Sequence, residues 1–126
     1  MNILLVGIGG ALGSVSRYLL GTWILSVSRS IDFPYGTLTV NLIGCFVIGF
    51  LSQLAEARGA FTSESRALIF VGILGGFTTF SSFGNDTINL LHDGESFNAL
   101  ANVGANVILG LLLVWLGRTA AYWIWK

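Results

Sequence analysis

Residues 72–83 read GILGGFTTFSSF and place paired glycines, threonines and phenylalanines within one apolar segment. Gly75 and Gly76 lower the cost of non-helical dihedral angles, and Thr78 or Thr79 offers a side-chain oxygen that can cap a new helix. We therefore expect the helix that contains this stretch to break here into two halves. Carbonyls freed at the end of the first half are suited to a cation, and the positive end of the second half favours an anion.

Two phenylalanines follow the expected break. Phe80 and Phe83 are three residues apart, so on a helix they share a face and lie about 4.5 Å apart along its axis. The edge of an aromatic ring is the positive part of its quadrupole, so two ring edges can line a path for an anion without trapping it. Apolar packing is the alternative for the phenylalanines, and hydrogen bonding to their own helix backbone is the alternative for Ser81 and Ser82.

The chain as a whole is too apolar for an ordinary water-exposed surface. Of its 126 residues, 54% are hydrophobic and only 10% are charged, and the mean hydropathy is +0.81. A hydrocarbon core of about 30 Å takes roughly 20 helical residues to cross, so the chain has room for four crossings and little else. We expect an all-α membrane protein with four transmembrane helices per subunit, in a single domain over residues 1–126.

Four apolar segments supply these crossings, and short loops that carry charges separate them. The segments run over Ile3 to Val27, Tyr35 to Ala55, Ala67 to Leu91 and Ala99 to Trp125. Short loops are typical of antiparallel neighbouring helices. The expected break falls within the third segment, at mid-membrane depth, where irregular backbone is tolerated only if it is buried in protein or lines a cavity.

The charged residues exclude some partners and leave the orientation nearly undetermined. Six basic and six acidic side chains cancel, so nucleic acid is not indicated as a partner. With a cytoplasmic N-terminus, the inner basic residues are Arg58, Arg66, Arg118 and Lys126, and the outer ones are Arg17 and Arg29. This slight bias is compatible with insertion in both orientations, which an antiparallel homodimer requires.

Small residues form faces along the first and third segments. These positions are Gly9, Gly13 and Gly21, with Arg17 at the same spacing, and Gly72 and Gly76. Such faces let helix backbones approach closely, either within one subunit or between two. Arg17 lies at mid-segment and must face protein or water, where it either draws anions into a vestibule or ties helices together.

Polar side chains in the second and fourth segments are too costly to face lipid. They are Thr37, Thr39 and Asn41 in the second segment, and Asn98, Asn102 and Asn106, spaced by four, in the fourth. Hydrogen bonding between helices and pore lining both use these donors, and the sequence leaves the two roles open.

Acidic and catalytic groups are scarce. The first segment has no acid, and Asp86 is the only acid inside any of the four segments, near the end of its helix. A proton-coupled mechanism requires a carboxylate deeper in the membrane. His92 and Cys45 are the only residues of their kinds and cannot build a credible catalytic set or metal site, so we do not expect an enzyme.

Several stretches resemble the Fluc (CrcB) fluoride channel family. Residues 75–83, GGFTTFSSF, are similar to the family's GGxTTFSTF signature, and residues 34–44, PYGTLTVNLIG, are similar to its PxGTLxxNxxG. Residues 9–18, GGALGSVSRY, are similar as well, so the resemblance covers essentially the whole chain. One departure is Ser82, where the family usually has threonine, but the hydroxyl donor is retained.

The resemblance implies a passive channel that exports fluoride from a bacterial cell through the cytoplasmic (inner) membrane. The subunits would pair as an antiparallel, dual-topology homodimer in the lipid bilayer, with two pores built from both copies. The implied pore residues are Asn41, Phe80, Ser81, Ser82, Phe83 and Asn106. The backbone carbonyls of Gly75 and Thr78 from each subunit would hold a structural Na⁺ at the dimer axis. Fluoride is small and strongly hydrated, so a narrow path of donors and ring edges can replace its water.

Two other functions remain open. A small multidrug-type, proton-coupled transporter also has four helices and pairs in opposite orientations, but it needs a glutamate in the first helix, where this chain has Arg17. A non-transporting assembly subunit would use the glycine faces as interface and the asparagines as helix-to-helix hydrogen bonds. Fluoride flux from purified protein in liposomes distinguishes all three.

Overall fold

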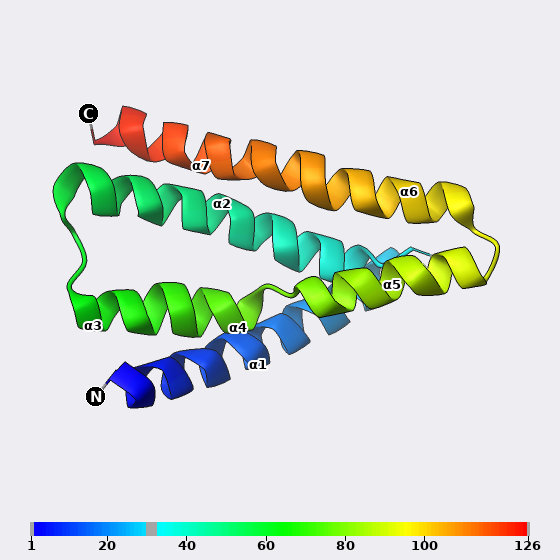
Figure 1. Ribbon diagram of the computed structural model, residues 1–126, viewed down its shortest axis with the longest axis horizontal. Helices are drawn as coiled ribbons and strands as arrows, with labels where there is room; N and C mark the ends of the chain where they lie inside the picture. The colour runs from blue at the N-terminus through cyan, green and yellow to red at the C-terminus, as the bar shows by residue number, and fades with distance from the viewer. Residues whose placement is uncertain (1, 30–32, 126) are drawn as a thin grey trace.

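The computed structural model describes residues 2–29 and 33–125 of the chain. The described residues form four long helical rods, and rods that follow one another in the chain run antiparallel, as Figure 1 shows. Each rod is long and apolar enough to cross a membrane, so the prediction of an all-α chain with four apolar helices is confirmed. Lys126, which entered the orientation argument, lies outside the described residues.

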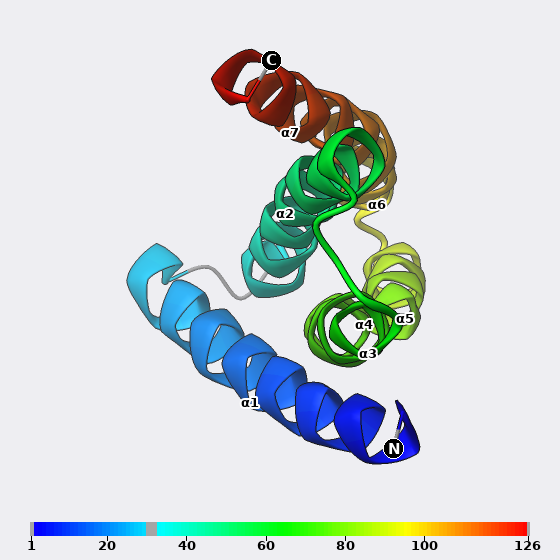
Figure 2. The same cartoon turned by 90° about the vertical axis from the view of Figure 1, so that its left-hand side faces the viewer.

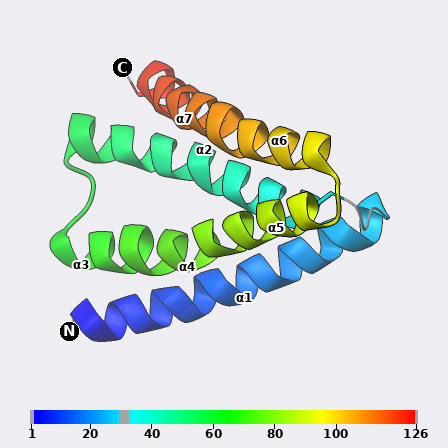
Figure 3. The ribbon, with the colours of Figure 1, turned by 45° about the vertical axis from the view of Figure 1, so that its right-hand side comes forward.

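Two of the rods are composed of several helical pieces. The first two are α1 (Asn2–Ser28) and α2 (Tyr35–Arg58). The third comprises α3 (Ser63–Arg66), the π-helical η1 (Ala67–Leu74), α4 (Gly75–Phe77) and α5 (Phe80–His92). The fourth comprises α6 (Ser96–Gly104), the π-helical η2 (Ala105–Leu109) and α7 (Gly110–Ile124). The start of α1, the α2–α3 loop and the end of α7 lie at one end of the bundle (Figures 1 and 3).

Capping residues set the helix ends on either side of the α2–α3 loop. The second helix continues three residues beyond the predicted end, until Gly59 adopts a left-handed φ of 56° and donates its N–H to the Ala55 carbonyl. The third rod begins at Ser63, earlier than predicted, because Thr62 Oγ1 accepts a hydrogen bond of 3.1 Å from the Ser65 N–H. The sequence-based boundaries followed apolar composition, whereas the caps are polar or glycine.

Helix packing divides the bundle into two close pairs, α1 with the third rod and α2 with α7, and α2 links the two pairs. The first helix packs against η1 and α4, the second packs along α7, and α1 also contacts α2. In the end-on view of Figure 2, α2 lies between α1 and α7. The same helix also contacts η2 and α5, so α2 is the element from which a side chain can reach both composite rods.

The glycine faces of the first and third rods meet inside one subunit. A Cβ added to Gly9 would lie 2.9 Å from the Gly72 Cα, and a Cβ added to Gly13 would lie 2.9 Å from the Phe77 N. Real side chains do not approach so closely, so both positions require glycine for this packing. The close contacts that the sequence left open are therefore made within the subunit.

Large apolar side chains cover much of the outer surface. Leu74, Leu90 and Val40 are among the few large apolar residues that are buried, whereas many others are exposed along α1, α6 and α7. An exposed apolar surface of this extent fits contact with lipid or with another protein chain rather than with water.

Candidate functional site

The helical backbone of the third rod is interrupted at two threonines. Thr78 has φ −86° and ψ 157°, and Thr79 has φ −148° and ψ 122°, so both are extended. The first half closes at Thr78, whose N–H and Oγ1 each donate to the Leu74 carbonyl at 3.0 Å. The second half opens at Thr79, whose Oγ1 accepts from the Ser82 N–H at 3.2 Å. Thr79 is therefore the N-cap of α5.

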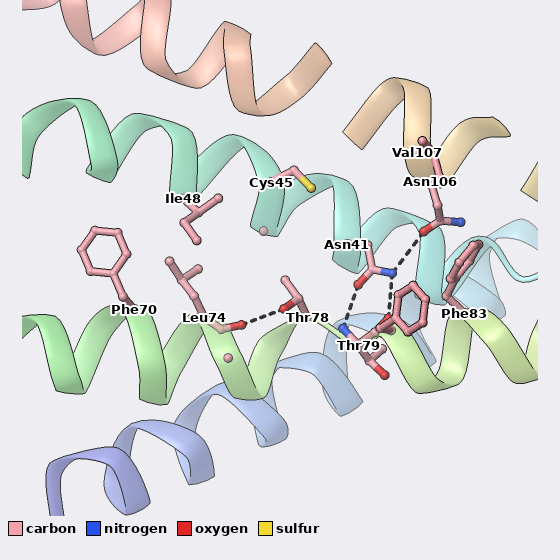
Figure 4. Close-up of a pocket in the computed structure, with 13 residues that line it drawn as sticks. Asn41, Cys45, Ile48, Phe70, Leu74, Thr78, Thr79, Phe83, Asn106 and Val107 are labelled. Carbon is pink, nitrogen blue, oxygen red and sulfur yellow. Dashed lines mark hydrogen bonds between the residues drawn. The ribbon is translucent and has the colours of Figure 1, made fainter. Parts of the chain in front are cut away.

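The side chain of Asn41 on α2 hydrogen-bonds to the main chain at the interruption. Its Nδ2 donates to the Thr79 carbonyl at 3.0 Å, and the Thr79 N–H donates to its Oδ1 at 2.9 Å (Figure 4). An asparagine amide carries the same donor and acceptor as a peptide group, so it pairs with the extended residue as a neighbouring strand would. Two main-chain polar groups that the interruption frees are thus satisfied in an apolar setting.

Asn41 is the first member of a longer hydrogen-bonded chain, which we call the amide ladder and which comprises Asn41, Asn106, Asn102 and Thr87. Asn41 Nδ2 also donates to Asn106 Oδ1 at 3.1 Å. Asn106 Nδ2 donates to the Asn102 Oδ1 at 3.0 Å and to its carbonyl at 2.8 Å. Asn102 Nδ2 donates to Thr87 Oγ1 at 3.0 Å, and Thr87 Oγ1 donates to the Phe83 carbonyl at 2.8 Å. The ladder thereby joins α2, the fourth rod and α5.

A cavity of about 400 Å³ lies beside the interruption, between α2, the third rod and η2. We call it the phenylalanine cavity. Its lining includes Asn41, Gly75, Thr78, Phe80, Phe83 and Asn106. The structure therefore brings six of the residues singled out in the sequence to one hollow, which Figure 4 shows with its lining side chains.

The two phenylalanines form a tilted pair on the first turn of α5. Their ring centroids are 5.5 Å apart and their planes meet at 59°. Phe80 is 81% exposed in the single subunit, whereas Phe83 is half-buried. Both rings line the phenylalanine cavity, so the pair presents aromatic groups to the hollow rather than filling the core of the bundle.

A smaller cleft of about 180 Å³ lies elsewhere at the interruption, bordered by α1 and the start of α2. Arg17, Thr37, Thr79 and Ser82 are among its lining residues. The Arg17 Nε donates to the Gly76 carbonyl at 3.0 Å, so this arginine ties α1 to α4 while it also lines the cleft. Ser82 thus lies with the arginine and not in the phenylalanine cavity.

Ser81 lines neither hollow. It is exposed on the single subunit, and its Oγ lies 3.4 Å from Thr79 Oγ1, close enough for a hydrogen bond. Of the residues predicted to line the two pores, the structure groups Asn41, Phe80, Phe83 and Asn106 of one subunit together and places the two serines outside that group.

Comparison with known proteins identifies the family. The sequence model of the family described as "CrcB-like protein, Camphor Resistance (CrcB)" matches residues 4–118. The chain belongs to the CrcB family. Its curated relatives include proteins called "Fluoride-specific ion channel FluC" from several organisms. The one from Parabacteroides distasonis is 49% identical over 117 residues, which cover 93% of this chain and 90% of that protein.

Two further relatives of this CrcB chain carry the same name. The protein from Rhizobium meliloti is 47% identical over 116 residues, with 92% of each chain covered. The protein from Methylobacillus flagellatus is 45% identical over 116 residues, which cover 92% of this chain and 91% of that protein. The similarity therefore extends over nearly the full length of both chains.

One member of the amide ladder of this CrcB chain, Thr87, was not predicted from the sequence, although a hydroxyl inside an apolar helix is itself a signal that a partner is present. The sequence shows Asn102 only as one of three asparagines spaced by four in the fourth segment. The structure gives it the interhelical role, since it is 1% exposed and bonded on both sides.

A third hollow, of about 770 Å³, lies at the end of the bundle away from the start of α1. Arg29, Asp86, Asp93 and Glu95 are among its lining residues, as is Thr37. The one acid inside the CrcB chain's apolar segments therefore lies at this polar end and not at the interruption.

Proposed function

We propose that this CrcB chain is the subunit of a passive, fluoride-selective ion channel. The observation that carries the proposal is the phenylalanine cavity, which gathers Asn41, Phe80, Phe83 and Asn106 beside an interrupted helix. Relatives that match almost the whole chain are named fluoride-specific ion channels. The cavity offers a small anion the ring edges of two phenylalanines. The amide N–H groups of Asn41 and Asn106 already donate within the protein, so the two amides position this site.

The chemistry of the site favours an anion without trapping it. The start of α5 carries the partial positive charge of a helix N-terminus, and the ring edges of Phe80 and Phe83 add weakly positive surface. Ser81 and Ser82, on the same turn, would offer hydroxyl donors along the route. Arg17 is engaged with the Gly76 carbonyl, so its full charge acts from the neighbouring cleft and not within the phenylalanine cavity.

A second copy, in the opposite orientation, would complete the pore. The interruption lies in the middle of the third span, Ser63–His92, which supports a position at mid-membrane depth. Gly75, Phe80 and Ser81 are nonetheless exposed on the single subunit. Polar backbone and hydroxyl groups at this depth are costly to leave in lipid. An antiparallel partner that covers this face would create two equivalent pores by symmetry.

The same interruption would suit a structural Na⁺ at the dimer axis. Because the Thr79 N–H turns to Asn41, it no longer meets the Gly75 carbonyl as it would in a continuous helix. Carbonyl oxygens at the end of a half-helix are suitable ligands for Na⁺. The Gly75 and Thr78 carbonyls of two copies would hold the ion, whose charge would offset the partial negative charge there.

Fluoride efflux from liposomes that contain only the purified protein tests this function. We expect release of fluoride under its own gradient, without a proton or sodium gradient, and little release of chloride. Strict dependence on a pH gradient would favour the multidrug-type transporter instead. Absence of flux with correctly inserted protein would favour an assembly subunit.

A further inference from the structure

We propose that Thr87 and Asn102 are positioning residues for conduction: they hold the first two turns of α5 so that Phe80 and Phe83 keep their places in the phenylalanine cavity. The inference rests on the proposed function for its link to fluoride. Neither residue lines any of the three hollows described above. Both act only through the amide ladder.

The direction of every hydrogen bond in the ladder is fixed by its two ends. The Thr79 N–H can only donate, so Asn41 must present its oxygen there. Its nitrogen then faces Asn106, which must answer with its oxygen, and the Asn106 nitrogen faces the oxygens of Asn102. Because the Asn102 oxygens accept from Asn106, its Nδ2 faces Thr87 and donates to Thr87 Oγ1.

The other end of the ladder is equally fixed. Thr87 Oγ1 accepts from Asn102 and donates to the Phe83 carbonyl at 2.8 Å. A carbonyl can only accept. The ladder therefore admits one arrangement of donors and acceptors, and reversing one amide would set like groups against each other.

The ladder is bonded to α5 at both of its ends. One end bonds to the N-cap Thr79, and the other end is Thr87, about two helical turns further along the same helix. It starts at Thr79, passes through α2 and the fourth rod, and ends at Thr87 and the Phe83 carbonyl. The residues between these points include both phenylalanines. Because the interruption removes the preceding helical turn, this part of α5 depends on side chains from other helices for its position.

Burial makes the ladder hard to replace. Asn102 is 1% exposed, so water cannot substitute for a lost partner, and an unpaired amide there is costly. The loss of the Thr87 hydroxyl therefore favours a rearrangement that carries the first turns of α5 with it.

The test compares three threonine variants. Thr87→Val keeps the shape and removes the hydroxyl, and Thr87→Ser keeps the hydroxyl. Thr119→Val on α7 is the matched control, because Thr119 Oγ1 also donates to the carbonyl four residues earlier, that of Trp115, at 2.9 Å. Fluoride flux per folded protein and hydrogen–deuterium exchange of residues 79–87 are measured for each.

Loss of one buried hydrogen bond shifts the balance between the positioned and displaced forms of α5 about tenfold. We therefore expect Thr87→Val to lower flux about tenfold and to speed amide exchange over residues 79–83. Thr87→Ser and Thr119→Val should both remain close to wild type. Wild-type flux and exchange in Thr87→Val, or equal losses in Thr87→Val and Thr87→Ser, would overturn the proposal. If Thr87→Val does not fold, Thr87→Cys, which keeps only a weak donor, replaces it, and wild-type values in both measurements overturn the proposal.

The two measurements separate this inference from the proposed function. If the wild-type protein passes no fluoride, the channel function fails, and the exchange experiment still decides whether the ladder positions α5. If the wild-type protein conducts and the exchange of Thr87→Val is unchanged, the ladder inference alone fails.

Discussion

The side-chain amide of Asn41 pairs with both main-chain polar groups of Thr79, through bonds of 3.0 Å to the carbonyl and 2.9 Å from the N–H. One side chain thus takes the place of the helical neighbours that an extended residue in a membrane helix has lost. An interruption in an apolar environment is stable only when such a partner is present. The pairing also means that the Asn41 amide is engaged on both of its polar atoms, so it shapes the site as well as lining it.

Replacement of Asn41 should lower the free energy of unfolding, because the pairing with Thr79 is lost. Asn41→Leu leaves the N–H and carbonyl of Thr79 unpaired, at a cost of about 1–3 kcal/mol for each group. Asn41→Asp keeps an acceptor for the Thr79 N–H but sets a carboxylate against the Thr79 carbonyl and Asn106 Oδ1 in an apolar setting, so we expect a loss at least as large. Denaturant unfolding in detergent measures both. Gln53→Leu, which removes an amide from the same helix well away from the interruption, is the control, and equal stability of Asn41→Leu and Gln53→Leu would contradict the prediction.

Aromatic edges and apolar packing make opposite forecasts for the phenylalanine pair. If the rings present their edges to fluoride, Phe80→Ile and Phe83→Ile should fold and assemble but conduct far less, because isoleucine keeps much of the volume and loses the positive edge. If the rings only pack, the same changes should lower stability and leave flux per folded protein nearly normal. Flux is therefore normalised to protein of the wild-type elution volume in size-exclusion chromatography.

Phe97→Ile on α6 is the matched control for that experiment, since Phe97 is as exposed as Phe80, at 81%, and does not line the phenylalanine cavity. It should conduct normally. Normal flux in both Phe80→Ile and Phe83→Ile would end the ring-edge mechanism for this protein.

The packing of α1 on the third rod predicts which glycines tolerate a methyl group. Gly13→Ala would place a Cβ against the backbone of Ile73 and 2.9 Å from the Phe77 N, so we expect a loss of about 1–3 kcal/mol in the free energy of unfolding. At Gly7 a Cβ meets no atom within 4 Å, so Gly7→Ala should be neutral or stabilise the helix by up to about 1 kcal/mol. Thermal unfolding in detergent compares the two, and equal midpoints would show that the glycine contact is not tight.

Antiparallel assembly predicts that each loop is found on both sides of the membrane. In a Cys45→Ser background, single cysteines introduced as Ala60→Cys in the α2–α3 loop and Asp93→Cys after α5 should each be labelled partly from outside intact cells. The remaining fraction should react only after permeabilisation. Labelling of each position from one side alone would show a single orientation and would exclude the antiparallel homodimer.

A structural Na⁺ should stabilise the folded protein. A ligand that binds only the native state adds about 2.7 kcal/mol at a concentration 100 times its dissociation constant. The Tm in detergent should therefore rise with NaCl and not with N-methyl-D-glucamine chloride of equal ionic strength. Equal Tm values in the two salts would argue against a sodium site formed by the Gly75 and Thr78 carbonyls.

Local chemistry allowed several features to be predicted without a structure. The four apolar segments, their antiparallel order and the Phe80–Phe83 pair follow from hydropathy and helical spacing. Helix ends were less accurate at the α2–α3 loop, because Gly59 and Thr62 act through backbone conformation and capping, which hydropathy does not measure.

The sequence by itself determined what each segment is: apolar runs of membrane length, with glycine faces, and asparagines and hydroxyls that must find partners. Only the tertiary structure decided which partners they find. Gly9 and Gly13 lie against the third rod of the same subunit, and Asn102 bonds to Thr87 while Asn41 and Asn106 line the phenylalanine cavity. The physical reason is that an amide has the same need for hydrogen bonds in a pore as between helices. Its role is therefore fixed by the rotation and spacing of neighbouring helices, which arise from contacts between residues far apart in the chain.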